Sequence, residues 1–91
     1  MLDLFADFHK TVGDVFDSVS AAGKRPRGET QRRYSDALRA WVRTRTERPD
    51  LADVERCIKA VAYAASAQSE QGFAEAVFTH GPRLLAEMTR P

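Results

Sequence analysis

Residues 51–67, with the sequence LADVERCIKAVAYAASA, decide the fold class of this chain. Leu51, Val54, Ile58, Val61 and Ala65 recur at steps of three and four residues, which is the spacing of one face of an α-helix. The small alanine side chains between them allow a neighbouring helix to approach closely. The stretch therefore predicts an amphipathic helix that ends near residue 67 and packs along one side.

A second helix is predicted directly before this one, from Thr30 to residue 47 or 48. Thr30 is the expected N-cap, and Pro49 lies just beyond the last turn as a stop. Asp50 is the expected N-cap of the following helix, so only a residue or two separates the two helices. We expect them to form an αα-hairpin at the centre of the fold. The inward positions of this second helix are Tyr34, Leu38, Trp41 and Val42.

The first 20 residues also follow a helical pattern, with one apolar face made of Phe5, Phe8, Val12, Val15 and Val19. The opposite face is a candidate acidic docking face, made of Asp3, Asp7, Asp14 and Asp17. These carboxylates are expected to be solvated, without apolar walls that would shift their pKa. Residues 21–29, with two glycines, one proline and three basic side chains, predict a mobile basic loop.

The C-terminal quarter has a shorter pattern. Phe73 to Phe78 predicts a turn or two of helix, and Gly81 interrupts it. Pro82 is well placed as the first residue of a last short helix. No run of alternating apolar and polar residues indicates a strand. We therefore expect an all-α fold, a small bundle of four to five helices with a central αα-hairpin, in a single domain over residues 1–91.

The formal net charge of +1 conceals an uneven distribution. Residues 1–23 carry four acids and one lysine, whereas residues 24–48 carry nine basic side chains and three acids. A path of cations of this kind is able to neutralise phosphates or acidic side chains. A solvated helix face beside a flexible loop is the simpler interpretation. The candidate binding residues of this segment are Lys24, Arg25, Arg27, Arg32, Arg39 and Arg43.

Tyr63 is a further candidate, because it projects away from the inner stripe of its helix. Arg56 and Lys59 lie beside it on the same surface. An aromatic ring with two cations is suited to stack on a base or to anchor a protein partner. Cover by the C-terminal segment is the equal alternative for this ring.

The sequence predicts no enzyme and no catalytic, cofactor-binding or metal site. His9, Cys57 and His80 are the only soft metal ligands, and they lack the short spacing of a zinc site. Cys57 falls at the edge of a core stripe, which favours a buried structural thiol. A single cysteine fits a reducing compartment, and neither a signal peptide nor a membrane span is indicated. A cytoplasmic protein without a membrane partner is expected.

Short motifs between residues 39 and 85 resemble a known family. They are Ala40-Trp41, PDLADV at residues 49–54, Cys57-Ile58, Phe78-Thr79 and PRLL at residues 82–85. About half the chain is thereby similar to the small helical C-terminal domain of phage and plasmid replication initiators and helicase-loader-like proteins. The resemblance implies an interaction module associated with the DNA replication of a mobile element.

Three functional hypotheses follow from these observations. The first is a non-enzymatic protein-interaction module with opposed acidic and basic faces. The second is a nucleic-acid-binding protein that uses the basic loop and the arginine face of the second helix, without specific base reading. The third is a structural homo-oligomer such as a homodimer, because the apolar seam of residues 1–20 has coiled-coil spacing.

Overall fold

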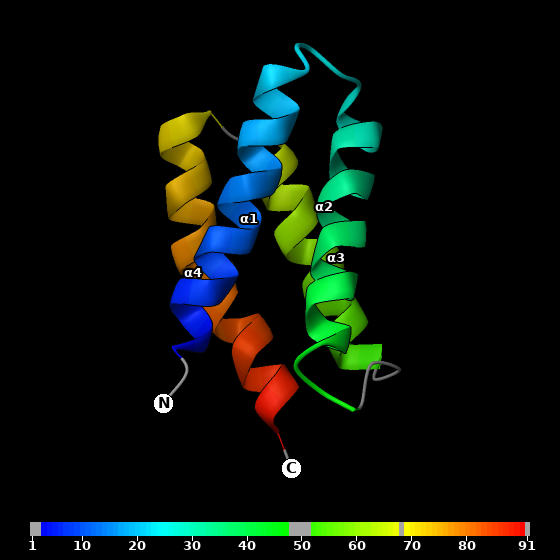
Figure 1. Ribbon diagram of the computed structural model, residues 1–91, viewed down its shortest axis with the longest axis vertical. Helices are drawn as coiled ribbons and strands as arrows, with labels where there is room; N and C mark the ends of the chain where they lie inside the picture. The colour runs from blue at the N-terminus through cyan, green and yellow to red at the C-terminus, as the bar shows by residue number, and fades with distance from the viewer. Residues whose placement is uncertain (1–2, 48–51, 68, 91) are drawn as a thin grey trace.

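A computed structural model describes residues 3–47, 52–67 and 69–90, and these residues form four α-helices. In chain order the helices are α1 (Leu4–Ala21), α2 (Arg27–Arg43), α3 (Ala52–Ser66) and α4 (Glu70–Thr89). They run alternately up and down along the long axis of the bundle (Figure 1). The described residues contain no strand, which confirms the all-α prediction. None of the helices described is both long and apolar enough to cross a membrane.

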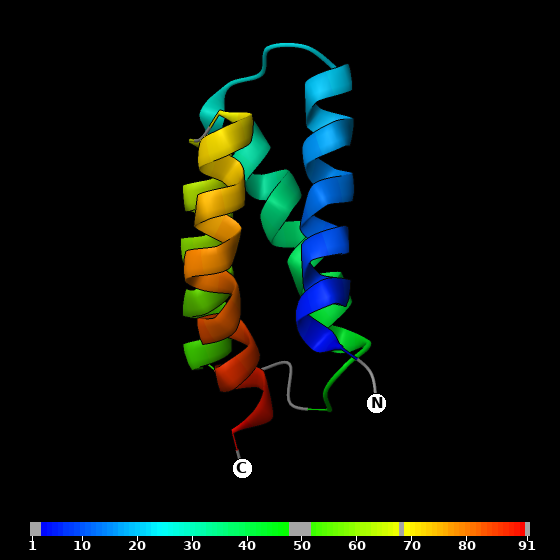
Figure 2. The same cartoon turned by 90° about the vertical axis from the view of Figure 1, so that its left-hand side faces the viewer.

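The helices pack in a ring around one core. α1 packs on α2 and α4, and α3 packs on α2 and α4. The same order is visible in two perpendicular views, where α2 and α3 run antiparallel (Figures 1 and 2). Residues from all four helices meet at the centre, among them Phe8, Leu38, Ile58 and Leu84.

The predicted inward faces of α2 and α3 are confirmed. Each of the four residues expected inside α2 is buried, and so are Val54, Ile58, Val61 and Ala65 of α3. These positions follow from helical spacing alone, because a helix that packs along one side must bury one stripe. The predicted Asp50 cap, Leu51 and the Pro49 stop lie outside the described residues.

The predicted loop of residues 21–29 is too long, because α2 begins earlier than expected. The backbone amides of Glu29 and Thr30 both donate to the carbonyl oxygen of Pro26, so residues 27–29 already form a helical turn. Thr30 is therefore not the N-cap. It is buried in the first turn, and its hydroxyl donates to the same Pro26 carbonyl oxygen. The connection between the helices shortens to residues 22–26, where Gly23 takes a positive φ of 88°.

The end of α2 also differs from the prediction. The helix stops at Arg43, and Thr44 is its C-cap. The backbone amide and the hydroxyl of Thr44 both donate to the carbonyl oxygen of Trp41, over 3.1 and 2.6 Å, and close the last turn. Residues 44–47 therefore leave the helix before the expected end.

α4 is one continuous helix rather than two short ones, and Pro82 lies inside it. The buried positions Phe73, Val77, Gly81 and Leu84 keep one helical phase through the proline. Pro82 removes one backbone donor and crowds the preceding turn, which bends a helix. Figure 1 shows α4 bending over its C-terminal half. Continuous burial of one stripe on both sides of Pro82 outweighs the local cost of the proline.

Candidate binding surface

The exposed side of α2 and α3 carries a shallow basic groove. The cleft at its centre has a volume of about 320 Å³. Arg27 precedes the lining residue Gly28, and Tyr63 follows the lining residue Lys59 by about one helical turn. The side chains of Arg27 and Tyr63 contact each other beside the cleft. We call these residues together the basic groove: Arg27, Gly28, Gln31, Arg32, Ser35, Arg39, Lys59 and Tyr63.

Tyr63 is the exposed aromatic residue of the groove, with 53% of its surface accessible. The guanidinium carbon of Arg27 lies 3.9 Å from the centre of the Tyr63 ring, in a cation–π contact. The sequence placed Tyr63 beside Arg56 and Lys59 and did not foresee Arg27. Arg27 and Tyr63 lie on different helices, so helical spacing carries no signal for this contact. The C-terminal segment does not cover the ring.

Three of the predicted binding cations are neutralised within the chain. Arg25 pairs with Glu29 over 2.7 Å, and Arg56 pairs with Asp53. Arg39 bridges two helices, because its Nε donates to Glu55 over 2.9 Å while its other end lies 3.6 Å from Asp36. A guanidinium that is paired with a carboxylate has fewer free donors for a ligand. Arg25, Arg39 and Arg56 are therefore weaker candidates than the sequence indicated.

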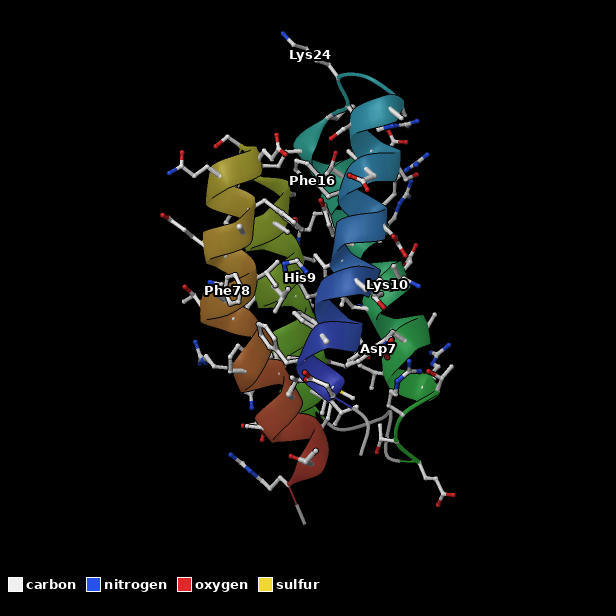
Figure 3. The ribbon with its side chains drawn as sticks, turned by 60° about the vertical axis from the view of Figure 1, so that its left-hand side comes forward. Asp7, His9, Lys10, Phe16, Lys24 and Phe78 are labelled. Carbon is white, nitrogen blue, oxygen red and sulfur yellow. The ribbon has the colours of Figure 1, made fainter. Side chains whose placement is uncertain are left out.

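The other predicted cations form no ion pair with a described carboxylate. Arg27, Arg32 and Lys59 converge on the basic groove. Arg43 is exposed at the last turn of α2. Lys24 points away from the bundle at the connection between α1 and α2 (Figure 3). The structure thus brings three of the candidates together and leaves Lys24 and Arg43 apart.

The predicted acidic docking face of α1 divides into two parts. Asp14 and Asp17 are exposed, as expected. Asp3 is the N-cap of α1 and accepts hydrogen bonds from the backbone amides of Phe5 and Ala6. Asp7 accepts a hydrogen bond of 2.8 Å from the indole nitrogen of Trp41. Only Asp14 and Asp17 therefore keep their carboxylates free of hydrogen bonds to described residues.

The expectation that Asp7 is solvated is wrong. Its side chain is 28% exposed, and it faces α2 from the side of α1 turned away from α4 (Figure 3). The hydrogen bond from Trp41 and then that from Arg45 lower the pKa of Asp7 below its ordinary value of 3.8. Both donors favour the charged carboxylate. The Arg45 guanidinium also lies 5.2 Å from the centre of the Trp41 ring. Asp7 and its hydrogen-bond donor Arg45 are 38 residues apart in the sequence.

A second exposed aromatic residue was missed by the sequence analysis. Phe78 on α4 is 61% exposed and stacks on Phe5, with 5.4 Å between ring centres. His9 lies 5.8 Å from the same ring, between α1 and α4 (Figure 3).

Cys57 is half-buried rather than fully buried. It packs against the core and lines a cleft of about 390 Å³ between α3 and α4, together with His80 and Arg83. Across the described ranges, no group of three or more His, Cys, Asp or Glu residues is arranged to hold a metal ion. The thiol and the imidazole share this cleft although 23 positions separate them in the sequence.

Comparison of the chain with protein-family models, with curated proteins and with solved structures gives no match.

Proposed function

We propose that this chain is a non-enzymatic interaction module that binds an acidic segment of a partner protein in the basic groove. The observation that carries the proposal is the exposed Tyr63 ring with Arg27 above it, beside Arg32 and Lys59. Three cations without a described carboxylate partner provide the charge, and the aromatic ring provides a rigid anchor. Tyrosine and arginine are enriched among the residues that dominate binding energies at protein interfaces.

The charge pattern outside the groove supports a protein partner rather than a long polyanion. Asp14 and Asp17 are exposed on α1, and Glu70 and Glu75 are exposed on α4. The chain carries a net charge of only +1. A nucleic acid that extended beyond the groove would meet these carboxylates, whereas a short acidic segment would contact the groove alone. Like charges placed opposite each other disfavour the wrong partner.

Nucleic-acid binding is the second candidate, and one observation favours it. Tyr63 presents a ring face beside cations, which is how proteins without sequence preference hold single-stranded nucleic acid. The resemblance to replication initiators and helicase loaders adds a replication setting to either candidate, as a further part of the proposal. The homo-oligomer hypothesis loses part of its motivation, because Phe8 and Val12 of the predicted seam are buried within one chain.

The test is fluorescence anisotropy with a labelled acidic peptide and, in parallel, a labelled single-stranded DNA. The groove variant carries Arg27→Glu, Arg32→Glu and Lys59→Glu. The matched control carries Lys10→Glu, Arg33→Glu and Arg83→Glu, which makes the same change of net charge at exposed positions outside the groove. We expect the peptide to bind at least about tenfold more weakly to the groove variant and nearly unchanged to the control.

Three results would count against the proposal. The first is that the peptide does not bind the native chain. The second is that both variants lose peptide binding equally, which would mean that only the overall charge matters. The third is that the DNA binds more tightly than the peptide, with an affinity that falls steeply as salt rises and that Tyr63→Ala weakens. That result would replace the protein partner by nucleic acid.

A further inference from the structure

The face of the bundle formed by α1 and α4 lies opposite the basic groove and carries an exposed aromatic cluster. The Phe78 ring protrudes from this face with 61% of its surface accessible. It stacks on Phe5 at 5.4 Å and lies 5.8 Å from the His9 ring, so its position is fixed from the α1 side. An aromatic ring that is held on one side and open to solvent on the other is suited to anchor a partner.

The exposed side of α1 next to this ring is low. Ala6, His9, Lys10 and Gly13 have the spacing of the four residues that form a hole for one side chain of a facing helix. Ala6 is exposed, and, apart from its chain neighbours and the backbone of α1, no atom lies within 4 Å of a Cβ at Gly13. Two of the four positions are therefore small and open, which leaves room for a large ring.

The exposed charges on the two sides of this face are opposite. Lys10 is exposed on α1, and Glu75 is exposed on α4 about one turn before Phe78. Neither pairs with a described residue of opposite charge. Asp14 lines a cleft between α1 and α2, and Asp17 is about 10 Å further along the helix axis than Lys10. The cation nearest the hole and the carboxylate nearest the ring are thus complementary.

A second copy of the chain, related by a two-fold axis parallel to the helices, matches these features. Figure 3 shows Phe78 on α4 and Lys10 on the far side of α1, with His9 between them. The two-fold operation lays α4 of each copy on α1 of the other, antiparallel, because α1 and α4 run in opposite directions within one chain (Figure 1). Each ring then meets the hole on the other copy, and Glu75 of each copy faces Lys10 of the other. Every contact occurs twice, as in other two-fold interfaces.

We propose that the α1–α4 face is the contact surface of a two-fold homodimer, in which Phe78 of each copy inserts between Ala6 and Gly13 of the other. This surface differs from the predicted seam of residues 1–20, of which Phe8 and Val12 are buried inside the chain. The basic groove stays open on both copies, so the dimer does not depend on the function proposed for the groove. A dimer of this kind presents two grooves to a partner, which raises the avidity for a partner with two acidic segments.

The test is sedimentation equilibrium of the native chain from micromolar concentration to about 1 mM. Phe78→Ser removes the protruding ring, and Tyr63→Ser is the matched control, because Tyr63 is 53% exposed on the opposite face. Glu75→Lys and Lys10→Glu each place like charges opposite each other in the dimer. The double variant restores opposite charges in exchanged positions. All four substituted residues are exposed, so the variants are expected to keep the fold.

We expect the mass of the native chain and of Tyr63→Ser to rise with concentration from that of one chain toward that of two. Phe78→Ser should dimerise at least about tenfold more weakly. Each single charge variant should also weaken the dimer about tenfold, because it acts at two symmetric sites, and the double variant should return close to the native value.

A native chain that stays monomeric at about 1 mM would overturn the proposal. Equal dimerisation of Phe78→Ser and the native chain would do the same. A double charge variant no better than the single ones would show that Lys10 does not face Glu75, and the two-fold arrangement would be wrong. Each of these results leaves peptide binding in the basic groove as a separate question.

Discussion

At each end of the bundle an aromatic side chain with a hydrogen-bond donor lies near an aspartate of α1, but only one of the two donors bonds to its aspartate. At the end that holds the chain termini, the indole nitrogen of Trp41 donates to Asp7, and Arg45 completes the cluster. At the other end the Tyr34 hydroxyl has no described partner, although Asp17 is close enough to raise its pKa. The Phe8 ring packs edge to face against Trp41, whereas a cleft lies beside Tyr34. The Trp41 donor is therefore held by hydrogen bonding and ring packing within the protein, whereas the Tyr34 residue borders a cleft.

Among the substitutions that test this comparison, truncation of Trp41 should lower the free energy of unfolding most. Trp41 is 6% exposed, its ring meets Phe8 edge to face at 5.7 Å, and its N–H holds Asp7. We expect Trp41→Ala to lower the free energy of unfolding by about 3–5 kcal/mol, measured by urea denaturation. Tyr63→Ala is the control for loss of an aromatic ring, because Tyr63 is 53% exposed. Similar losses in both variants would mean that the contacts of Trp41 with Phe8 and Asp7 do not stabilise the fold.

A smaller effect is expected where α4 meets α1. A Cβ atom at Gly81 would lie 2.7 Å from the Phe8 ring, which is fully buried and has little room to move. Overpacking of this kind costs about 1–3 kcal/mol, against a gain of at most about 1 kcal/mol from helix propensity. Gly81→Ala should therefore lower the free energy of unfolding.

Gly13→Ala is the matched control for this substitution. Apart from its chain neighbours and the backbone of its own helix, no atom lies within 4 Å of a Cβ at Gly13, so only the propensity gain of about 0.5–1 kcal/mol remains. The two glycine variants should shift the urea midpoint in opposite directions. Shifts of the same sign would mean that the contact between Gly81 and Phe8 does not constrain the packing.

The pH dependence of stability tests the role of Asp7 at the end of the bundle that holds the chain termini. Its folded pKa is lower than its unfolded pKa, so it stabilises the fold above its ordinary pKa near 3.8. That stabilisation is lost as the pH falls through the lowered folded pKa. We expect Asp7→Asn to be less stable than the native chain at neutral pH and to approach it as the pH falls below 3.8.

Denaturation curves between pH 7 and pH 2 measure this difference. Asp14→Asn is the control, because Asp14 is exposed and makes no hydrogen bond with a described residue. A gap between the native chain and Asp7→Asn that stays constant over the whole range would show that the carboxylate charge is not what holds Trp41 and Arg45.

The smallest effect is expected for Tyr34→Phe. Its hydroxyl has no described partner, so its removal should change the free energy of unfolding by less than about 1 kcal/mol at neutral pH. Desolvation, and then the charge of Asp17, raise the pKa of Tyr34 to about 12. A raised pKa of this kind gives stability that is present below the unfolded value of about 10 and is lost as the pH rises toward 12.

Stability measured from pH 9 to pH 12 distinguishes the native chain from Tyr34→Phe. The native chain should lose stability in this window beyond the loss that the variant shows. Identical profiles would mean that the hydroxyl is solvated, and the contrast between the two ends of the bundle would weaken.

The helical faces were predictable from the sequence, and the polar contacts were less so. The buried stripes of α2 and α3 follow from spacing, and the exposure of Tyr63 follows from its phase on α3. The basic groove was predicted in part: the sequence analysis named Arg27, Arg32, Arg39, Lys59 and Tyr63 as candidates but did not predict that they lie together. The contact of Arg27 with Tyr63 and the neutralisation of Arg39 by Glu55 join different helices. No local pattern encodes which residues of two helices meet.

The sequence alone determined the helical class, the stripes that face the core and the uneven charge. These properties depend on interactions three or four residues apart, which a linear pattern records directly. Only the tertiary structure decided that α4 continues through Pro82, that Asp7 serves Trp41 and Arg45, and that a cleft remains beside Tyr34. Each of these depends on the burial or pairing of groups far apart in the chain, and their free energies outweigh the local preference of a proline or the expected solvation of a carboxylate.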